Sequence, residues 1–234
     1  MNPGPLLFLG TFFALATSWL TFILAPQLQI GGQEPVELAS TGQPYPSRPS
    51  GTARQGEQVY RANGCYYCHS QQVRPKGFGN DIARGWGGRP SLVQSVAADY
   101  LYDQPVMVGS QRIGPDLTNV GLRQPDAAWQ FKHLYNPRSV SPGSTMPPHR
   151  FLFEKRPLKF GEQPSKEAVE VGKGYEIVPG QDARALVAYL MSLHSDAILF
   201  ETPIFPKPEL KKAASTNAPA ATMTNSVSTN APAK

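Results

Sequence analysis

Cys65-Tyr66-Tyr67-Cys68-His69 holds both cysteines of this 234-residue chain and places a histidine directly after the second of them. The pattern C-x-x-C-H is the signature of c-type haem attachment. Two thiols about one helical turn apart can add to the two vinyl groups on one edge of the porphyrin, and the adjacent imidazole then falls under the iron. The sequence therefore predicts one covalently bound haem c, with Cys65 and Cys68 as attachment points and His69 as the proximal iron ligand.

Two other uses of a cysteine pair compete with this interpretation. A redox C-x-x-C normally follows a strand in a βαβ unit, and the sequence around the motif shows no such unit. Structural zinc needs a second ligand pair at matching spacing, and the four histidines offer none. A disulfide framework is excluded if both thiols hold a haem.

A haem iron with a histidine on one face has a sixth position to fill. The candidate ligands in the sequence are Met107, Met146, Met191, His133, His149 and His194. Met146 stands in the non-helical stretch Ser144-Thr145-Met146-Pro147-Pro148, and a methionine followed by proline on an extended loop can reach across a haem. We predict Met146 as the sixth ligand, with Met107, a histidine or an open position as alternatives. Met/His ligation favours reduced iron, because the soft thioether stabilises the ferrous state.

The segment Gly114-Pro115-Asp116-Leu117 lies between the cysteine motif and Met146. In small c-type cytochromes a proline at this place lines the proximal side, and its carbonyl accepts a hydrogen bond from the histidine Nδ1–H. We therefore expect Pro115 to fix the tautomer of His69 and to raise its basicity as a ligand. Arg112 and Arg138 are candidates to pair with the haem propionates, since a planar guanidinium matches a carboxylate. Solvated surface arginines are the alternative.

The N-terminal residues 6–25 (LLFLGTFFALATSWLTFILA) contain no charge and are bounded by prolines. About 20 such residues cross a hydrocarbon core of roughly 30 Å. A cleaved signal peptide is the alternative, but residues 1–5 lack Lys and Arg and no clear A-x-A site follows. Because c-type haem is attached on the outer side of an energy-transducing membrane, we expect a single-pass protein of the bacterial inner membrane with its domain on the periplasmic side.

The rest of the chain divides by composition. Residues 26–52 are rich in Gly, Pro and polar residues and are predicted to be a linker. Residues 53–198 are predicted to form a globular domain with helices at about 53–62, from Asp126 to before Pro137, and from about Asp182. Residues 199–234 form a Pro/Lys-rich extension and a low-complexity tail without the apolar content to fold. With 24 prolines and 21 glycines, long strands are not expected, so the predicted fold is all-α.

The formal net charge of +5 is mild and spread along the chain. No run of five or more Lys/Arg occurs, so no nucleic-acid partner is predicted. An acidic protein partner remains compatible with this charge.

Several segments, taken in order, resemble the mono-haem subunit (subunit II) of cbb3-type cytochrome c oxidases. These are the apolar anchor, Gly56-x-x-x-Tyr60, the haem motif with Ser70-Gln71, Tyr102-Asp103-Gln104-Pro105, Gly109–Leu117, His133–Val140 and Met146-Pro147. The resemblance implies a class I-like cytochrome c domain with long loop insertions. It also implies a non-catalytic subunit that receives electrons from another c-type cytochrome subunit and passes them to a haem-copper catalytic subunit.

The sequence departs from this family at a few positions. Gln104 stands where the family usually has His, and Val106 stands where it has an aromatic residue. Residues 84–88 look different, and residues 151–181 look longer than expected. Three other functions remain open: the cytochrome subunit of a nitric oxide reductase, a free-standing anchored electron carrier, and a haem-based gas sensor or peroxidase-like enzyme.

Overall fold

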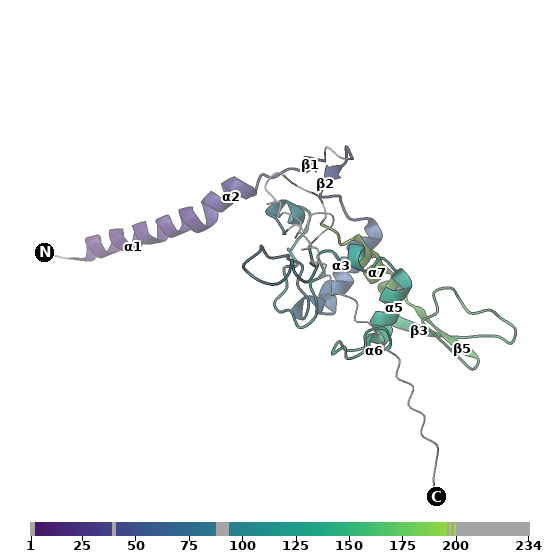
Figure 1. The fold of residues 1–234 in the computed structure, drawn as a ribbon. Helices are drawn as coiled ribbons and strands as arrows, with labels where there is room; N and C mark the ends of the chain where they lie inside the picture. Colours follow the sequence, from purple (N-terminus) through teal and green to yellow (C-terminus); the bar gives the residue numbers. More distant parts are fainter. Residues whose placement is uncertain (1–2, 39–40, 88–93, 196, 198, 200–234) are drawn as a thin grey trace, which may run out of the picture.

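A computed structural model of the chain describes residues 3–38, 41–87, 94–195, 197 and 199 (Figure 1). At the N-terminus, α1 (Gly4–Trp19), a π-helical turn (Leu20–Leu24) and α2 (Ala25–Ile30) follow one another without a break. Figure 1 shows this helix projecting from the rest of the chain. Its stretch Gly4–Gln29 is 26 residues long, has a mean hydropathy of 1.9, and buries none of its apolar window inside the protein. By length and composition it is able to cross a membrane.

The predicted apolar helix over residues 6–25 lies inside this longer helix. Pro26 was expected to bound it, but the helix continues past that proline. The reason is local: the N–H of Ala25 bonds to the carbonyl of Leu20, which widens the turn. Pro26, which has no N–H to donate, then occupies the first turn of α2, where proline is tolerated.

Part of the predicted linker is attached to the domain. Strands β1 (Val36–Glu37) and β2 (Pro44–Tyr45) form a short antiparallel ribbon. Tyr45 is buried against Ala98 and Leu199. Its hydroxyl donates to the carboxylate of Asp99 (2.7 Å) and lies 3.0 Å from Oγ of Ser195.

The body of the domain is built on two crossed helices, α3 (Gly51–Ala62) and α7 (Gln181–Ser192). Gly56 of α3 permits the close crossing, because a Cβ at this position would overlap the carbonyl of Ala185 in α7. One turn further along α3, the ring of Tyr60 packs at 5.4 Å from that of Tyr189. The remaining helices are α4 (Val120–Arg123), α5 (Ala127–Tyr135) and α6 (Pro137–Val140), with 3₁₀ turns at Cys65–Tyr67, Ala97–Tyr100 and Arg150–Leu152. The main buried cluster comprises Tyr60, Leu117, Val120, Phe131, Leu134, Leu152, Ala183, Leu186, Val187, Tyr189 and Leu190.

The three predicted helices are confirmed as α3, α5 and α7. Side-chain caps begin the first two of them. Ser50 accepts a hydrogen bond from the Ala53 N–H at 3.2 Å, and Asp126 accepts one from the Ala128 N–H at 2.9 Å. The predicted stripe of α7 is partly confirmed, because Leu186 and Leu190 are buried whereas the helix ends before Leu193.

The all-α prediction is not confirmed, because the described chain also contains two small antiparallel sheets. The larger one has the strand order β3-β5-β4, formed by β3 (Phe153–Pro157), β4 (Glu170–Gly172) and β5 (Tyr175–Pro179). Phe153 pairs with Pro179 at one end of the β3–β5 ladder, and Pro157 pairs with Tyr175 at the other. Figure 1 shows these strands extending away from the crossed helices.

Candidate haem site

The cysteine motif forms a tight turn directly after α3. Gly64, at φ +67°, turns the chain out of the helix in a conformation that favours glycine. The N–H groups of Cys68 and His69 both bond to the Cys65 carbonyl, at 3.1 and 3.0 Å. The two cysteines are thereby held about one turn apart, with their thiols unbridged. Burial raises the pKa of the Cys65 thiol to about 11, whereas a redox C-x-x-C needs a lowered one.

The imidazole of His69 is oriented by the predicted partner. Its Nδ1 lies 2.8 Å from the carbonyl oxygen of Pro115. Since a carbonyl only accepts, Nδ1 carries the proton and Nε2 keeps a free lone pair. Burial lowers the pKa of His69, which favours the neutral, metal-binding form of the ring.

The backbone around Pro115 is fixed against the motif. The Gly114 N–H bonds to the Cys68 carbonyl at 2.9 Å, and the Leu117 N–H bonds to the Ser70 carbonyl at 2.8 Å. A Cβ at Gly114 would overlap the His69 ring, so a side chain at this position would push the segment away from the imidazole. The glycine of the predicted segment is therefore required by the close approach of backbone to ring.

An apolar cavity of about 320 Å³ lies beside His69, between α3, α5 and α7. Four of the predicted site residues line it: Cys65, His69, Pro115 and Met146. Met146 comes from the irregular segment after α6, where its N–H lies 3.3 Å from Oγ of Ser144, and its side chain packs on the main cluster. Of the alternative sixth ligands, His133 also lines the cavity, whereas Met107, Met191, His149 and His194 are not among its lining residues.

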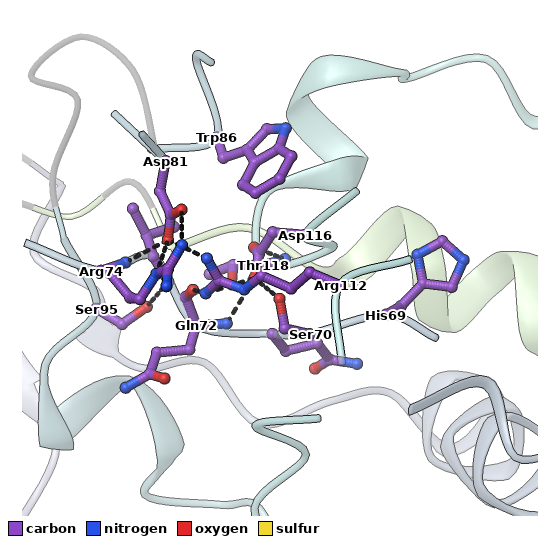
Figure 2. A network of polar contacts seen from close by, with 12 residues as sticks. His69, Ser70, Gln72, Arg74, Asp81, Trp86, Ser95, Arg112, Asp116 and Thr118 are labelled. Atoms are coloured by element: carbon purple, nitrogen blue, oxygen red, sulfur yellow. Dashed lines mark hydrogen bonds and ion pairs between the residues drawn. The ribbon is translucent and has the colours of Figure 1, made fainter. Parts of the chain in front are cut away.

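Arg112, the predicted partner of a propionate, lies outside this cavity. Figure 2 shows its guanidinium among Asp81, Asp116 and Gln72, turned away from the His69 ring. It is 2.5 Å from the Asp81 carboxylate and 3.8 Å from the Asp116 carboxylate, and it donates to the Gln72 carbonyl. Arg138, the second predicted arginine, does not line the cavity either.

The arginine that does line the cavity is Arg123, which was not predicted from the sequence. One of its terminal nitrogens donates to the Asp116 carbonyl. Its Nε is buried and has no hydrogen-bond partner within the part of the chain that the structure describes, and burial lowers the pKa of its guanidinium. The sequence offers only a weak signal for it, because Val120 and Gly121 before it are buried whereas the adjacent Leu122 is exposed.

Two buried carboxylates hold the chain that follows His69. Asp116, which is fully buried, accepts hydrogen bonds from Oγ of Ser70 (2.7 Å) and from the N–H groups of Gln72 (2.8 Å) and Thr118 (2.9 Å). Asp81 pairs with Arg112 and, at 3.0 Å, with Arg74 (Figure 2). This network stiffens the proximal side of the cavity, because it ties the residues after His69 to those around Pro115.

The residues present fit a haem. Two thiols stand one turn apart, one imidazole keeps Nε2 free, and a thioether lines the same apolar cavity. A buried guanidinium nitrogen has no partner in residues 3–38, 41–87, 94–195, 197 and 199. Such a guanidinium matches a propionate. The described residues contain no group of three or more His, Cys, Asp or Glu side chains placed to hold a metal ion.

A proximal imidazole within a C-x-x-C-H turn, beside an apolar cavity with a methionine in its wall, fits a haem protein of the cytochrome c type. The chain belongs to the family of mono-haem subunits of cytochrome c oxidase: the family model described as "Cytochrome C oxidase, mono-heme subunit/FixO" matches residues 6–177. The resemblance to subunit II of the cbb3-type oxidases is thereby confirmed. A comparison with individual curated proteins finds no match.

Proposed function

We propose that this chain is a membrane-anchored mono-haem c-type cytochrome that passes single electrons to the haem-copper catalytic subunit of a cbb3-type terminal oxidase. The observation that carries the proposal is the shared cavity of Cys65, His69 and Met146 in a chain of this family. The subunit itself needs no catalytic acid, base or nucleophile, because electron transfer through a haem edge requires only a held and tuned cofactor.

Each residue of the site has a separate task. A bound haem c would supply a one-electron iron couple. Cys65 and Cys68 would hold the porphyrin edge, and His69, oriented by Pro115, would present Nε2 to the iron. Met146 would offer a soft thioether, which favours the ferrous state. Arg123 would pair with a propionate through its unpartnered Nε.

The N-terminal helix would fix the cytochrome to the membrane beside its electron acceptor. The domain would lie on the periplasmic side of a bacterial inner membrane, because c-type haem is attached there. Gly10 and Ala14 form a small-xxx-small pair on this helix, and a Cβ at Gly10 would meet no atom within 4 Å. That open face suits close packing against a helix of the catalytic subunit. The electron donor would be another c-type cytochrome subunit, and no role with nucleic acid is proposed.

The experiment that tests the proposal is a mild-detergent purification through a tag on the tail beyond residue 213, followed by a reduced-minus-oxidised spectrum. We expect a covalent c-type haem signal together with b-type haem and a large multi-span subunit, and oxygen consumption by the purified complex. Nitric oxide reduction in place of oxygen reduction would assign the chain to the related reductase. A chain that purifies alone with one c-type haem would be a free-standing carrier, and the oxidase proposal would fail.

A further inference from the structure

His133 is a second side chain in the cavity wall that is able to bind iron. It lies on α5 and lines the same cavity as His69 and Met146. Its pKa is lowered by burial and by the nearby imidazoles of His69 and His149. The neutral ring, which is the metal-binding form, is therefore favoured.

The protein holds the plane of the His133 ring but does not fix its tautomer. The ring stacks on Trp129, with centroids 4.6 Å apart and planes 8° from parallel. Trp129 lies four residues earlier on the same helix, and Asp126 caps that helix. By contrast, Nδ1 of His133 is buried and finds no hydrogen-bond partner among the described residues. Nδ1 is thus free to keep the lone pair that a metal requires.

Met146 is positioned differently from His133. Its segment between α6 and the turn at Arg150–Leu152 has no regular structure and passes through Gly143 at φ +80°. A thioether is also a neutral, weakly basic ligand, so its bond to iron depends on the loop that presents it. If the methionine left the iron, His133 would be the remaining side chain of the cavity wall with a nitrogen lone pair to offer in its place.

We propose that His133 is a reserve axial ligand, which takes the sixth position of the haem iron when Met146 leaves it. The inference rests on the proposed function, since it requires a haem held by His69. His133 would thereby give α5 a functional role in addition to its packing. With His133 bound, the iron would stay six-coordinate and closed to small ligands. Electrons would then leave through the haem edge and not to oxygen bound at this iron.

The test compares variants of the full-length chain in detergent by electron paramagnetic resonance and by carbon monoxide binding to the reduced form. Met146→Leu removes the thioether at nearly constant volume, and we expect the haem iron of this variant to remain low-spin, with bis-histidine g-values. In the double variant Met146→Leu with His133→Gln, the iron should become high-spin. Carbon monoxide should bind to the double variant about tenfold faster or more, because distal access decides such binding. Added imidazole should restore the low-spin signal. Met146→Leu with His149→Gln is the matched control and should behave as Met146→Leu alone.

A high-spin Met146→Leu variant with rapid carbon monoxide binding would overturn the proposal, whether or not the double variant folds. His133→Gln alone should keep the thioether-to-iron charge-transfer band of the parent protein, and keeping it supports Met146 as the resting ligand. If His133→Gln alone becomes high-spin while Met146→Leu changes nothing, His133 is the resting ligand and its reserve role is wrong. Absence of covalent haem from every variant and from the parent would instead refute the proposed function.

Discussion

The side chain of Arg123 has a buried Nε for which the described residues supply no hydrogen-bond partner. Its other contact is to a backbone carbonyl, and no described ion pair includes it. A partly buried cation whose Nε is fully enclosed is costly unless an anion approaches it. The proposal therefore assigns a haem propionate to Arg123, whereas Arg112 pairs with Asp81 and Asp116.

Replacing Arg123 with Gln should lower the reduction potential of the haem. The unpaired propionate would add negative charge near the iron, which favours the ferric form. A hydrogen bond to a charged group contributes about 1.5–3 kcal/mol, and 59 mV corresponds to a factor of ten for one electron, so a shift of tens of millivolts is expected. Potentiometric titration measures it. Arg138→Gln, an exposed arginine away from the cavity, is the control and should leave the potential unchanged.

Because of Asp81, the free energy of unfolding should decrease as the pH falls below about 4. Burial alone would raise its pKa, but hydrogen bonds from Arg74 and Arg112 outweigh that effect and lower the pKa to about 2. The unfolded chain takes up this proton near pH 4, so the stabilisation is complete above that pH and is lost as the pH falls to about 2. Its size is on the order of 2 kcal/mol.

Denaturant unfolding at several pH values measures this contribution. Asp81→Asn should be less stable than the parent at pH 7 and should show a shallower loss between pH 4 and pH 2. Equal slopes for the parent and the variant would show that other carboxylates govern the acid transition.

Much of the site was predictable from the sequence at the level of single residues. His69 follows from a spacing that haem attachment dictates, Pro115 from its likeness to small c-type cytochromes, and Met146 from a Met-Pro pair on an extended loop; the structure brings all three to one cavity. Arg112 and Arg123 could not be ranked in the same way. Which of the two lines the cavity depends on whether Asp81, far along the loop after the motif, folds back to pair with Arg112.

At the scale of elements, the close crossing of α3 and α7 depends on Gly56, which has no side chain. Gly56→Ala would place a Cβ against the Ala185 carbonyl, and backbone cannot move aside as a side-chain tip can. We expect a loss of about 1 to 3 kcal/mol in the free energy of unfolding, as for other overpacked contacts. Gly51→Ala in the same helix meets no atom within 4 Å and should be neutral or slightly stabilising. Chemical unfolding followed by circular dichroism separates the two, and equal values would refute this account of the crossing.

The helices and the sheet differ in how far the sequence specifies them. α5 and α7 have apolar periodicity, and α5 also has an acidic N-cap, so their existence was predictable. β3 and β5 are five residues each, and β5 contains the buried Glu176, which breaks any apolar run. That carboxylate is satisfied by Arg156 and by the Ser165 N–H, which are contacts that only the folded sheet supplies.

At the scale of the whole molecule, the N-terminal helix and the domain have separable tasks. The apolar window of Gly4–Gln29 is not buried against the rest of the chain, so deletion of residues 1–30 should leave the haem spectrum unchanged. The same deletion should release the cytochrome from membranes washed with alkaline carbonate, whereas the full chain should stay bound.

An intact mass of the purified full chain checks the alternative of a cleaved signal peptide. Loss of residues 1–25 from that mass would contradict a retained anchor.

The contacts of Tyr45 with Asp99 and Ser195 set the length of the tether, which is the chain between α2 and the point where it is attached to the domain. Because β1 pairs Val36 with the docked Tyr45, only residues 31–35 are left to extend from the end of α2. A chain spans at most about 3.5 Å per residue, so this tether reaches roughly 18 Å. Without the ribbon and its contact the tether would run to the start of α3 and reach about 70 Å. In the proposed arrangement, a shorter tether would confine the haem to a smaller volume above the N-terminal helix and raise its local concentration at an acceptor packed on that helix. The contacts of one tyrosine would then limit which membrane neighbours the proposed electron transfer can reach.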